Sequence, residues 1–297
     1  MTTYNDMVEE VLINLEGFTL RQDRTTYLTA GIDDNDLSIA LASGDNIGKG
    51  LLEIDDELIH IDSVDRSDRS AVISPFGRGY RGTTAASHSA DAKVTFAPSF
   101  PRLSVKRAIN DTVKSIFPQV YGVGKTTFSF NASITTYSLP AEAEKILAIS
   151  WSDIGPSGEW FPIRNWRHDP TANVTVYATG NTVSIYEAIV PGRTIQVTYS
   201  KEPTSLSSGS DVFTTVTGLP SSARDLIVYG ASYRMVSFID PGRLNFTSPE
   251  ADQNDQTRQF GSGTNTARYL LALYQQRLQE ESQKLNGKYP VRVHYTI

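Results

Sequence analysis

The stretch GKYPVRVHYTI, residues 287–297, decides how the rest of the chain is interpreted. Apolar or aromatic side chains stand at every second position, which is typical of a β-strand. A long helical pattern precedes the stretch and closes at Gly287, and no second strand follows it in this sequence. Two interpretations stay open: the strand returns to a sheet of its own chain, or it is an arm that adds to the sheet edge of another molecule. The arm would bind its partner through Tyr289, Val291, Arg292, Val293, Tyr295 and Ile297.

Four segments upstream carry apolar side chains at helical spacing. The first follows Thr3 and Asp6, which are placed as a capping pair. Similar apolar stripes on helices from separated parts of a chain are buried most economically when the helices pack together as one bundle. The expected helices lie at about 4–16, 101–117, 219–235 and 265–287.

Two β-rich segments interrupt these helices, each built of short apolar runs separated by Gly and Asp turns. We therefore expect an α+β protein: a four-helix bundle with an inserted β-sandwich and a smaller inserted β subdomain, ending in an extended C-terminal strand or arm. The expected divisions are 1–36 for the first bundle helix, 37–98 for an acidic β subdomain, 99–125 for the second helix, 126–204 for the β-sandwich, 205–287 for helices three and four with their loop, and 288–297 for the arm.

Composition excludes several classes of protein. The 297 residues are 39% hydrophobic, enough for a large core, and the chain has no cysteine, so disulfides and thiolate chemistry are excluded. No basic, apolar leader or membrane-length apolar run is visible, so we expect neither secretion through a signal peptide nor a membrane partner.

The formal net charge of −6 is concentrated near the N-terminus, where residues 1–100 carry 17 of the 33 acidic side chains and 8 of the 27 basic ones. This balance argues against a sequence-reading DNA binder, which needs a basic surface for phosphates. It suits a surface past which DNA slides without sticking. Possible channel-lining residues are Asp55, Asp56 and Glu57.

Two glycine-rich segments imitate phosphate loops. Residues 77–82, GRGYRG, match a dinucleotide fingerprint but lack the acidic residue about twenty positions on. Residues 122–127, GVGKTT, end like a P-loop but have Gln119 where the motif needs glycine and lie between a helix and a strand in the wrong order. We expect no nucleotide at either segment, and the second is interpreted as a linker into the β-sandwich.

No other pattern indicates catalysis, a metal or a cofactor. The four histidines never approach ligand spacing, and the carboxylates at 53–57 lack the glycine and final glutamate of a calcium loop, so a charged hairpin turn is favoured. Three tryptophans lie within sixteen residues and are interpreted as core or interface, with a sugar-stacking platform as the alternative. They are Trp151, Trp160 and Trp166.

Three places resemble the head-to-tail connectors of tailed bacteriophages. Residues 77–88 read GRGYRGTTAASH, close to a GRGY-x-GT-x-A-x-x-H segment common in phage virion proteins. The second place joins Tyr137–Pro140, Trp151 and Trp160 to the strand at 190–199, and the third is Leu219-Pro220 leading into a helix with Asp225-Leu226 and Gly230-Ala231. The second and third together are similar to the adaptor proteins of the tail tubular A type.

The resemblance implies a virion structural protein without catalytic residues. Such adaptors form a homo-oligomeric ring, usually a dodecamer, that contacts the portal protein on one side and a tail nozzle, stopper or tail tube protein on the other. The ring would be assembled in the host cytoplasm, would lie in the virion neck and would let double-stranded DNA pass during packaging retention and ejection. The alternatives are a distal tail or baseplate component, since the GRGY segment is shared, and a carbohydrate-binding β-sandwich module.

Overall fold

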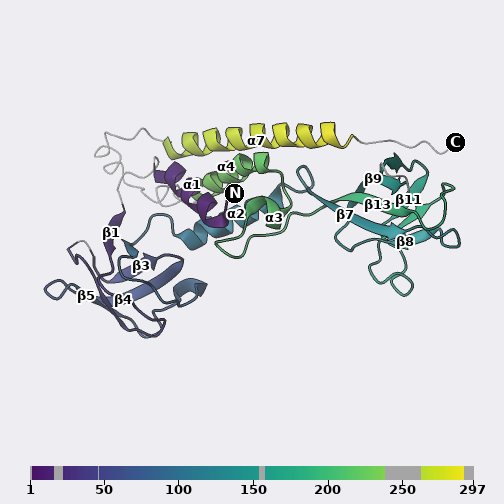
Figure 1. Ribbon diagram of the computed structural model, residues 1–297. Coiled ribbons are helices and arrows are strands. Elements are labelled where there is room, and N and C mark those ends of the chain that lie inside the picture. The colour runs from purple at the N-terminus through teal and green to yellow at the C-terminus, as the bar shows by residue number, and fades with distance from the viewer. Residues whose placement is uncertain (1, 17–22, 46, 154–157, 238–261, 291–297) are drawn as a thin grey trace. The chain divides into compact units, whose positions relative to one another are not determined.

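A computed structural model describes residues 2–16, 23–45, 47–153, 158–237 and 262–290 of the chain (Figure 1). The chain divides into two compact units. Unit 1 comprises Met1–Met7, Asn110–Gly230 and Arg268–Ile297. Unit 2 comprises Val8–Ile109 and Ala231–Ala267.

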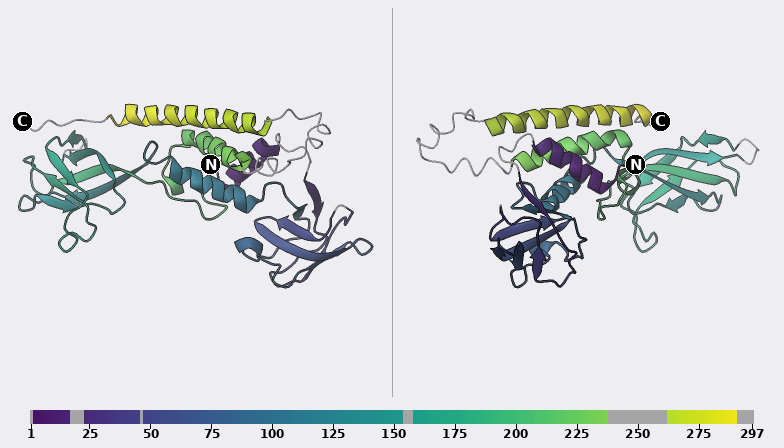
Figure 2. Two further views of the ribbon diagram at one scale, coloured as in Figure 1. Left: turned by 180° about the vertical axis from the view of Figure 1, so that it is seen from behind. Right: turned by 60° about the vertical axis from the view of Figure 1, so that its left-hand side comes forward.

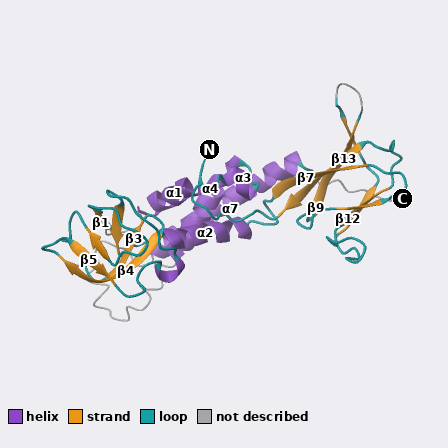
Figure 3. Cartoon of the chain, turned by 60° about the horizontal axis from the view of Figure 1, so that its bottom comes forward, coloured by secondary structure: helices purple, strands orange, loops and turns teal. Residues whose placement is uncertain are grey.

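The expected fold class, a four-helix bundle holding two β insertions, is wrong. The described residues form five α-helices and thirteen strands in three sheets, a mixed α/β fold rich in strands (Figure 3). No helical domain is set apart, because the division between the two units cuts through four of the helices and leaves sheet and helix in each unit. Long helical stripes are conspicuous in a sequence, whereas strands of three to five residues are individually weak signals. The domain boundaries expected from the sequence stay a prediction.

The helices begin and end close to their sequence signals. Thr3 and Asp6 form the reciprocal cap of the first helix, with N–H to side-chain distances of 2.7 and 3.2 Å. The last helix extends one residue past Gly287, whose φ is not left-handed, so the expected glycine cap is not present; both views in Figure 2 show this helix unbroken. The α-helices are α1 (Tyr4–Glu16), α2 (Arg102–Ser115), α3 (Phe213–Thr217), α4 (Arg224–Ser237) and α7 (Ser262–Lys288), and the 3₁₀ turns are η1 (Tyr80–Gly82) and η2 (Ser221–Ala223).

Gly230 marks a close approach of helices within unit 1. A Cβ at this position would lie 2.4 Å from Cγ2 of Thr112 on α2 and 2.9 Å from the ring of Tyr274 on α7. Both distances are shorter than real Cβ contacts, so α2, α4 and α7 approach one another here only because residue 230 has no side chain.

Unit 2 contains a six-stranded antiparallel sheet in the order β1-β6-β3-β4-β5-β2. Its two edge strands meet at a bridge between Leu28 and Leu41, so the sheet curls back on itself around one aliphatic core. The first of these strands was not expected, because four residues, RTTY, give almost no periodic signal. The strands are β1 (Arg24–Tyr27), β2 (Ser38–Ala40), β3 (Gly50–Ile54), β4 (Glu57–Asp65), β5 (Ser70–Ile73) and β6 (Lys93–Phe96).

Unit 1 contains a four-stranded sheet, β10-β9-β13-β7, and a three-stranded sheet, β11-β12-β8. Apolar residues of both sheets belong to one buried cluster, so the sheets share a core. A strand was also expected at Val174 and Val176, but these residues lie in turns and are each 68% exposed. The strands are β7 (Gly122–Ser129), β8 (Thr136–Ser138), β9 (Lys145–Ser152), β10 (Trp160–Pro162), β11 (Trp166–Asp169), β12 (Thr182–Ile185) and β13 (Thr194–Lys201).

Candidate functional site

The GRGY segment is fixed to one buried carboxylate, that of Glu57 at the start of β4. The Arg78 guanidinium donates a hydrogen bond to each carboxylate oxygen, from Nε at 2.9 Å and from Nη2 at 3.0 Å. The backbone N–H groups of Gly79 and Ala86 donate to the same carboxylate at 2.8 and 3.1 Å, and Nε2 of His88 lies 2.9 Å from it. Residues at both ends of the GRGY segment therefore converge on Glu57, a contact that the sequence does not predict. The spacing of the motif gave no sign of this partner, which lies about twenty to thirty residues upstream.

The Glu57 cluster is charged at neutral pH. Burial alone would raise the pKa of Glu57, but hydrogen bonds from His88, Arg78 and the two backbone N–H groups outweigh it and lower that pKa to about 2. The hydrogen bond to Glu57 raises the pKa of His88, and a second carboxylate, Asp55, adds to this effect from 2.8 Å. The cluster stabilises the loop of the GRGY segment, residues 77–88, because each of its charged side chains is hydrogen-bonded to another.

The expected channel-lining residues are therefore not equivalent. The side chain of Glu57 is 1% exposed, so Glu57 cannot line a channel, and its selection as a surface carboxylate is corrected. Asp56 is paired with Arg102 and Lys106 at 3.2 and 2.6 Å, whereas the side chain of Asp55 is 66% exposed.

Glu53 connects the sheet of unit 2 to the start of α2. Its carboxylate accepts the backbone N–H of Arg102 at 2.6 Å, as a helix N-terminus prefers. Burial raises the pKa of Glu53 to about 7, against the opposing effect of that hydrogen bond. The charge of this carboxyl group at the contact between β3 and α2 therefore depends on pH near neutrality.

Neither phosphate-loop imitation has the geometry of a nucleotide site. In the first, Gly79 and Arg81 adopt left-handed φ values of 59° and 55°, and a short 3₁₀ turn follows in place of a helix. In the second, Gly122 begins β7 itself, so this segment is a strand and not the linker expected. A Cβ at Gly124 would lie 2.4 Å from the ring of Tyr199, which explains that glycine by packing alone.

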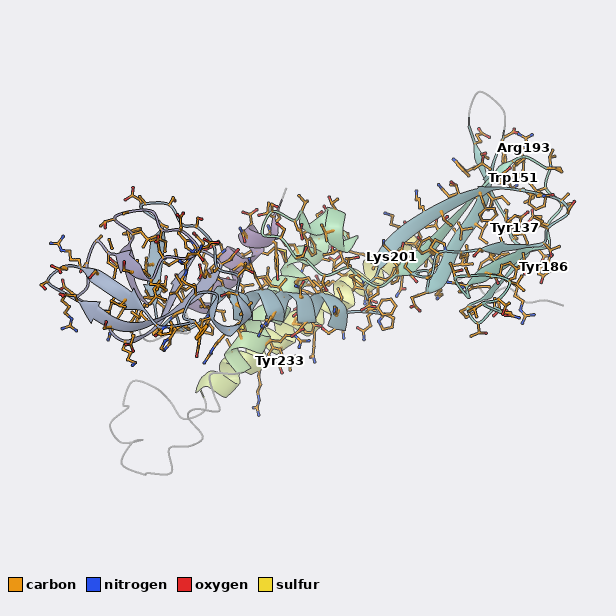
Figure 4. The ribbon with its side chains drawn as sticks, turned by 90° about the horizontal axis from the view of Figure 1, so that it is seen from below. Tyr137, Trp151, Tyr186, Arg193, Lys201 and Tyr233 are labelled. Carbon is orange, nitrogen blue, oxygen red and sulfur yellow. The ribbon has the colours of Figure 1, made fainter. Side chains whose placement is uncertain are left out.

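The three tryptophans do not form one platform. Trp151 stacks on Phe161 at 5.0 Å between ring centroids, and the Arg193 guanidinium lies 5.7 Å from the Trp151 ring, near one end of β13 (Figure 4). Trp160 and Trp166 instead line a recess of about 790 Å³ in unit 1. The tryptophans therefore contribute to separate surfaces, unlike an aromatic platform for a sugar ring.

That recess reaches the start of the predicted arm. Tyr289 and Pro290, which follow α7, are among its lining residues. Burial, together with the nearby Tyr289 hydroxyl, raises the pKa of Tyr121 at the same recess. The other arm residues, Val291, Arg292, Val293, Tyr295 and Ile297, lie outside the described residues.

The described histidines have local partners. His60 lies 2.7 Å from the Ser74 hydroxyl and His168 lies 2.7 Å from Oδ1 of Asn181, while His294 is outside the described residues. Within the described ranges no group of three or more His, Asp or Glu side chains could hold a metal ion. No helix in the same ranges is long and apolar enough to cross a bilayer.

A family model described as SU10 adaptor protein matches residues 83–293, most of the chain. The chain belongs to this family of phage head-to-tail adaptors, and the resemblance found in the sequence is confirmed. It is thus a structural phage adaptor, a virion component that interacts with other head or tail components. No curated protein matches the chain.

Proposed function

We propose that this adaptor acts without catalysis as a closed ring beneath the portal, where it links capsid to tail and surrounds the DNA path. The match to the adaptor family over residues 83–293 is the observation that carries the proposal. A ring of identical subunits is closed by heterologous contacts, in which one surface of a subunit meets a different surface of the next. We propose twelve subunits, with portal protein on one side and a nozzle, stopper or tail tube protein on the other.

We propose that the C-terminal arm makes the portal contact. Its period-two pattern suits addition to a free sheet edge, where main-chain hydrogen bonds give affinity and alternate side chains give specificity. Tyr289, the first of the expected partner-binding residues, still donates its N–H to the carbonyl of Leu285 at 2.8 Å as part of the helical pattern. A truncation after Pro290 therefore removes residues 291–297 and leaves the described end of α7 complete.

The test compares the full chain with this truncation by negative-stain electron microscopy, each alone and mixed with purified portal. The full chain should form rings and cap the portal, whereas the truncated chain should keep its melting temperature and lose the portal. A truncated chain that unfolds would show that residues 291–297 belong to its own core. Absence of rings and of portal binding by the full chain would overturn the proposed function.

We propose that exposed carboxylates keep the DNA path free of phosphate contacts, with Asp55 and Asp56 as the remaining candidates. A lysine in the channel would add salt-dependent affinity for DNA and slow its passage. Asp55→Lys should slow ejection at low salt, and added salt should relieve the defect. The matched control, Asp55→Asn, removes the pairing with His88 without adding a positive charge and should eject normally. Equal ejection rates for both variants would place Asp55 away from the channel.

A further inference from the structure

Phe76 has a backbone conformation that its side chain disfavours. It is the third residue of the turn Ser74–Gly77, which is closed by a 2.7 Å hydrogen bond from the Gly77 N–H to the Ser74 carbonyl. Its φ is 59°, in the left-handed region that glycine or asparagine ordinarily occupies at this turn position. A bulky residue here is a genuine steric outlier and calls for an explanation.

No packing within its own chain compensates for this strain, because Phe76 is 99% exposed. We call Phe76 and the turn that presents it, Ser74–Gly77, the Phe76 knob. A bulky apolar side chain that is both strained and fully exposed is explained by a contact outside its own chain.

The turn is held rigidly. The His60 N–H donates to the Gly77 carbonyl at 2.8 Å, and the Ser74 N–H donates to the His60 carbonyl at 2.9 Å. A Cβ on Gly77 would lie 2.4 Å from that His60 carbonyl, so the loop lies flat against β4. The next residue, Arg78, is fixed to the Glu57 carboxylate. Phe76 is therefore presented to solvent in one fixed direction, which reduces the ordering cost of binding.

An acidic loop borders the knob. Asp33, Asp34 and Asp36 are all exposed, and Arg78 donates from Nη1 to the carbonyls of Asp33 and Asp36, which places this loop beside the turn. Negative charge around an apolar tip repels DNA phosphates and anionic lipid headgroups. It attracts a protein recess that is apolar at its centre and carries Lys or Arg at its rim.

We propose that the Phe76 knob inserts into such a basic-rimmed apolar recess on a second virion protein. The cross-linking experiment below distinguishes this receptor from a second copy of the chain. The knob also precedes residues 83–293, the part that the adaptor family model describes, so it supplies a contact in addition to those of that region. The inference needs a virion partner but does not need the ring or the arm.

The first test places a photo-crosslinking phenylalanine analogue at position 76 of the full chain in assembled particles. The control carries the analogue at Tyr27, which is 52% exposed on β1 and outside the knob. Position 76 should cross-link to one other protein, at a site where mass spectrometry finds apolar and basic residues, and position 27 should not. Cross-links only to copies of this chain, to lipid or to DNA, or none above the control, would overturn the proposal.

The second test separates binding from folding. Phe76→Gly removes the strained side chain and should raise the unfolding midpoint of the isolated protein, because glycine adopts this φ freely. The same substitution should lower affinity for the cross-linked partner by about tenfold or more, as expected for an aromatic hot spot. Phe76→Asn, which also tolerates this φ, should bind as weakly as the glycine variant, while Tyr27→Ala should bind like wild type. A glycine variant that binds its partner normally would contradict the assignment.

Discussion

Glu57→Gln is the substitution that most severely tests the account of the GRGY segment. The Glu57 carboxylate accepts five hydrogen bonds, two from Arg78 and one each from Gly79, Ala86 and His88. Glutamine keeps the shape but offers one acceptor oxygen and turns an N–H₂ group toward other donors. It also leaves Arg78, and His88 whose pKa this carboxylate raises, without their shared negative charge, although their side chains are only 8% and 2% exposed.

Removing one partner of a buried, hydrogen-bonded ion pair costs about 3–5 kcal/mol, because the remaining charge stays buried. We expect a loss of that size in the free energy of unfolding of unit 2. The matched control is Asp55→Asn, which removes the outer carboxylate bound to His88. Because the Asp55 side chain is 66% exposed, its loss should cost about 1 kcal/mol or less.

Hydrogen exchange measured by mass spectrometry assigns the loss to its place in the chain. Peptides from residues 50–96 should lose protection in Glu57→Gln, whereas peptides from residues 122–201 in unit 1 should exchange as in wild type. A loss below about 1 kcal/mol, or one no larger than that of Asp55→Asn, would refute the reasoning that Glu57 organises the segment.

Two further predictions concern packing and pH. Gly230→Ala should lower the melting temperature by an amount corresponding to about 1–3 kcal/mol, because its Cβ would overlap Thr112 and Tyr274; an unchanged melt would refute the close helix approach. The stability of unit 2 should fall between pH 5 and 8 in denaturant titrations, because the pKa of Glu53 is raised from 4.5 to about 7 and that of His88 is raised from 6.5. Both groups bind protons more tightly when folded, so their stabilisation is present at low pH and lost as the pH rises through the folded values. The Glu53→Gln variant should lose less stability than wild type between pH 5 and 8. A wild-type stability that rises toward pH 8 would contradict this prediction.

Local signals predicted single elements of the fold well. The reciprocal pair of Thr3 and Asp6 predicted where α1 begins, and Pro101 marked the start of α2. These succeeded because a cap is satisfied by neighbours in sequence. The fold class failed because it depends on how sheets and helices share cores, which apolar stripes on separate helices do not specify.

The site was less accessible from the sequence. The GRGY segment was found by its resemblance, but its attachment to Glu57 is a contact between β4 and a distant loop, without any periodic signature. Asp56 and Glu57 are adjacent in sequence, yet Asp56 is partly exposed and paired with Arg102, whereas Glu57 is buried. This difference comes from the alternation of side chains along a strand, which composition does not show. Phe76 was missed because only the backbone angle reveals its strain.

The position of this chain in the assembled particle tests the central claim most directly. Cryo-electron microscopy of intact virions, with the chain identified from its side-chain density, should show it as a ring between the portal and the tail, around the DNA path. Density for the chain only at the distal tail or baseplate, or no closed ring at the neck, would contradict the account.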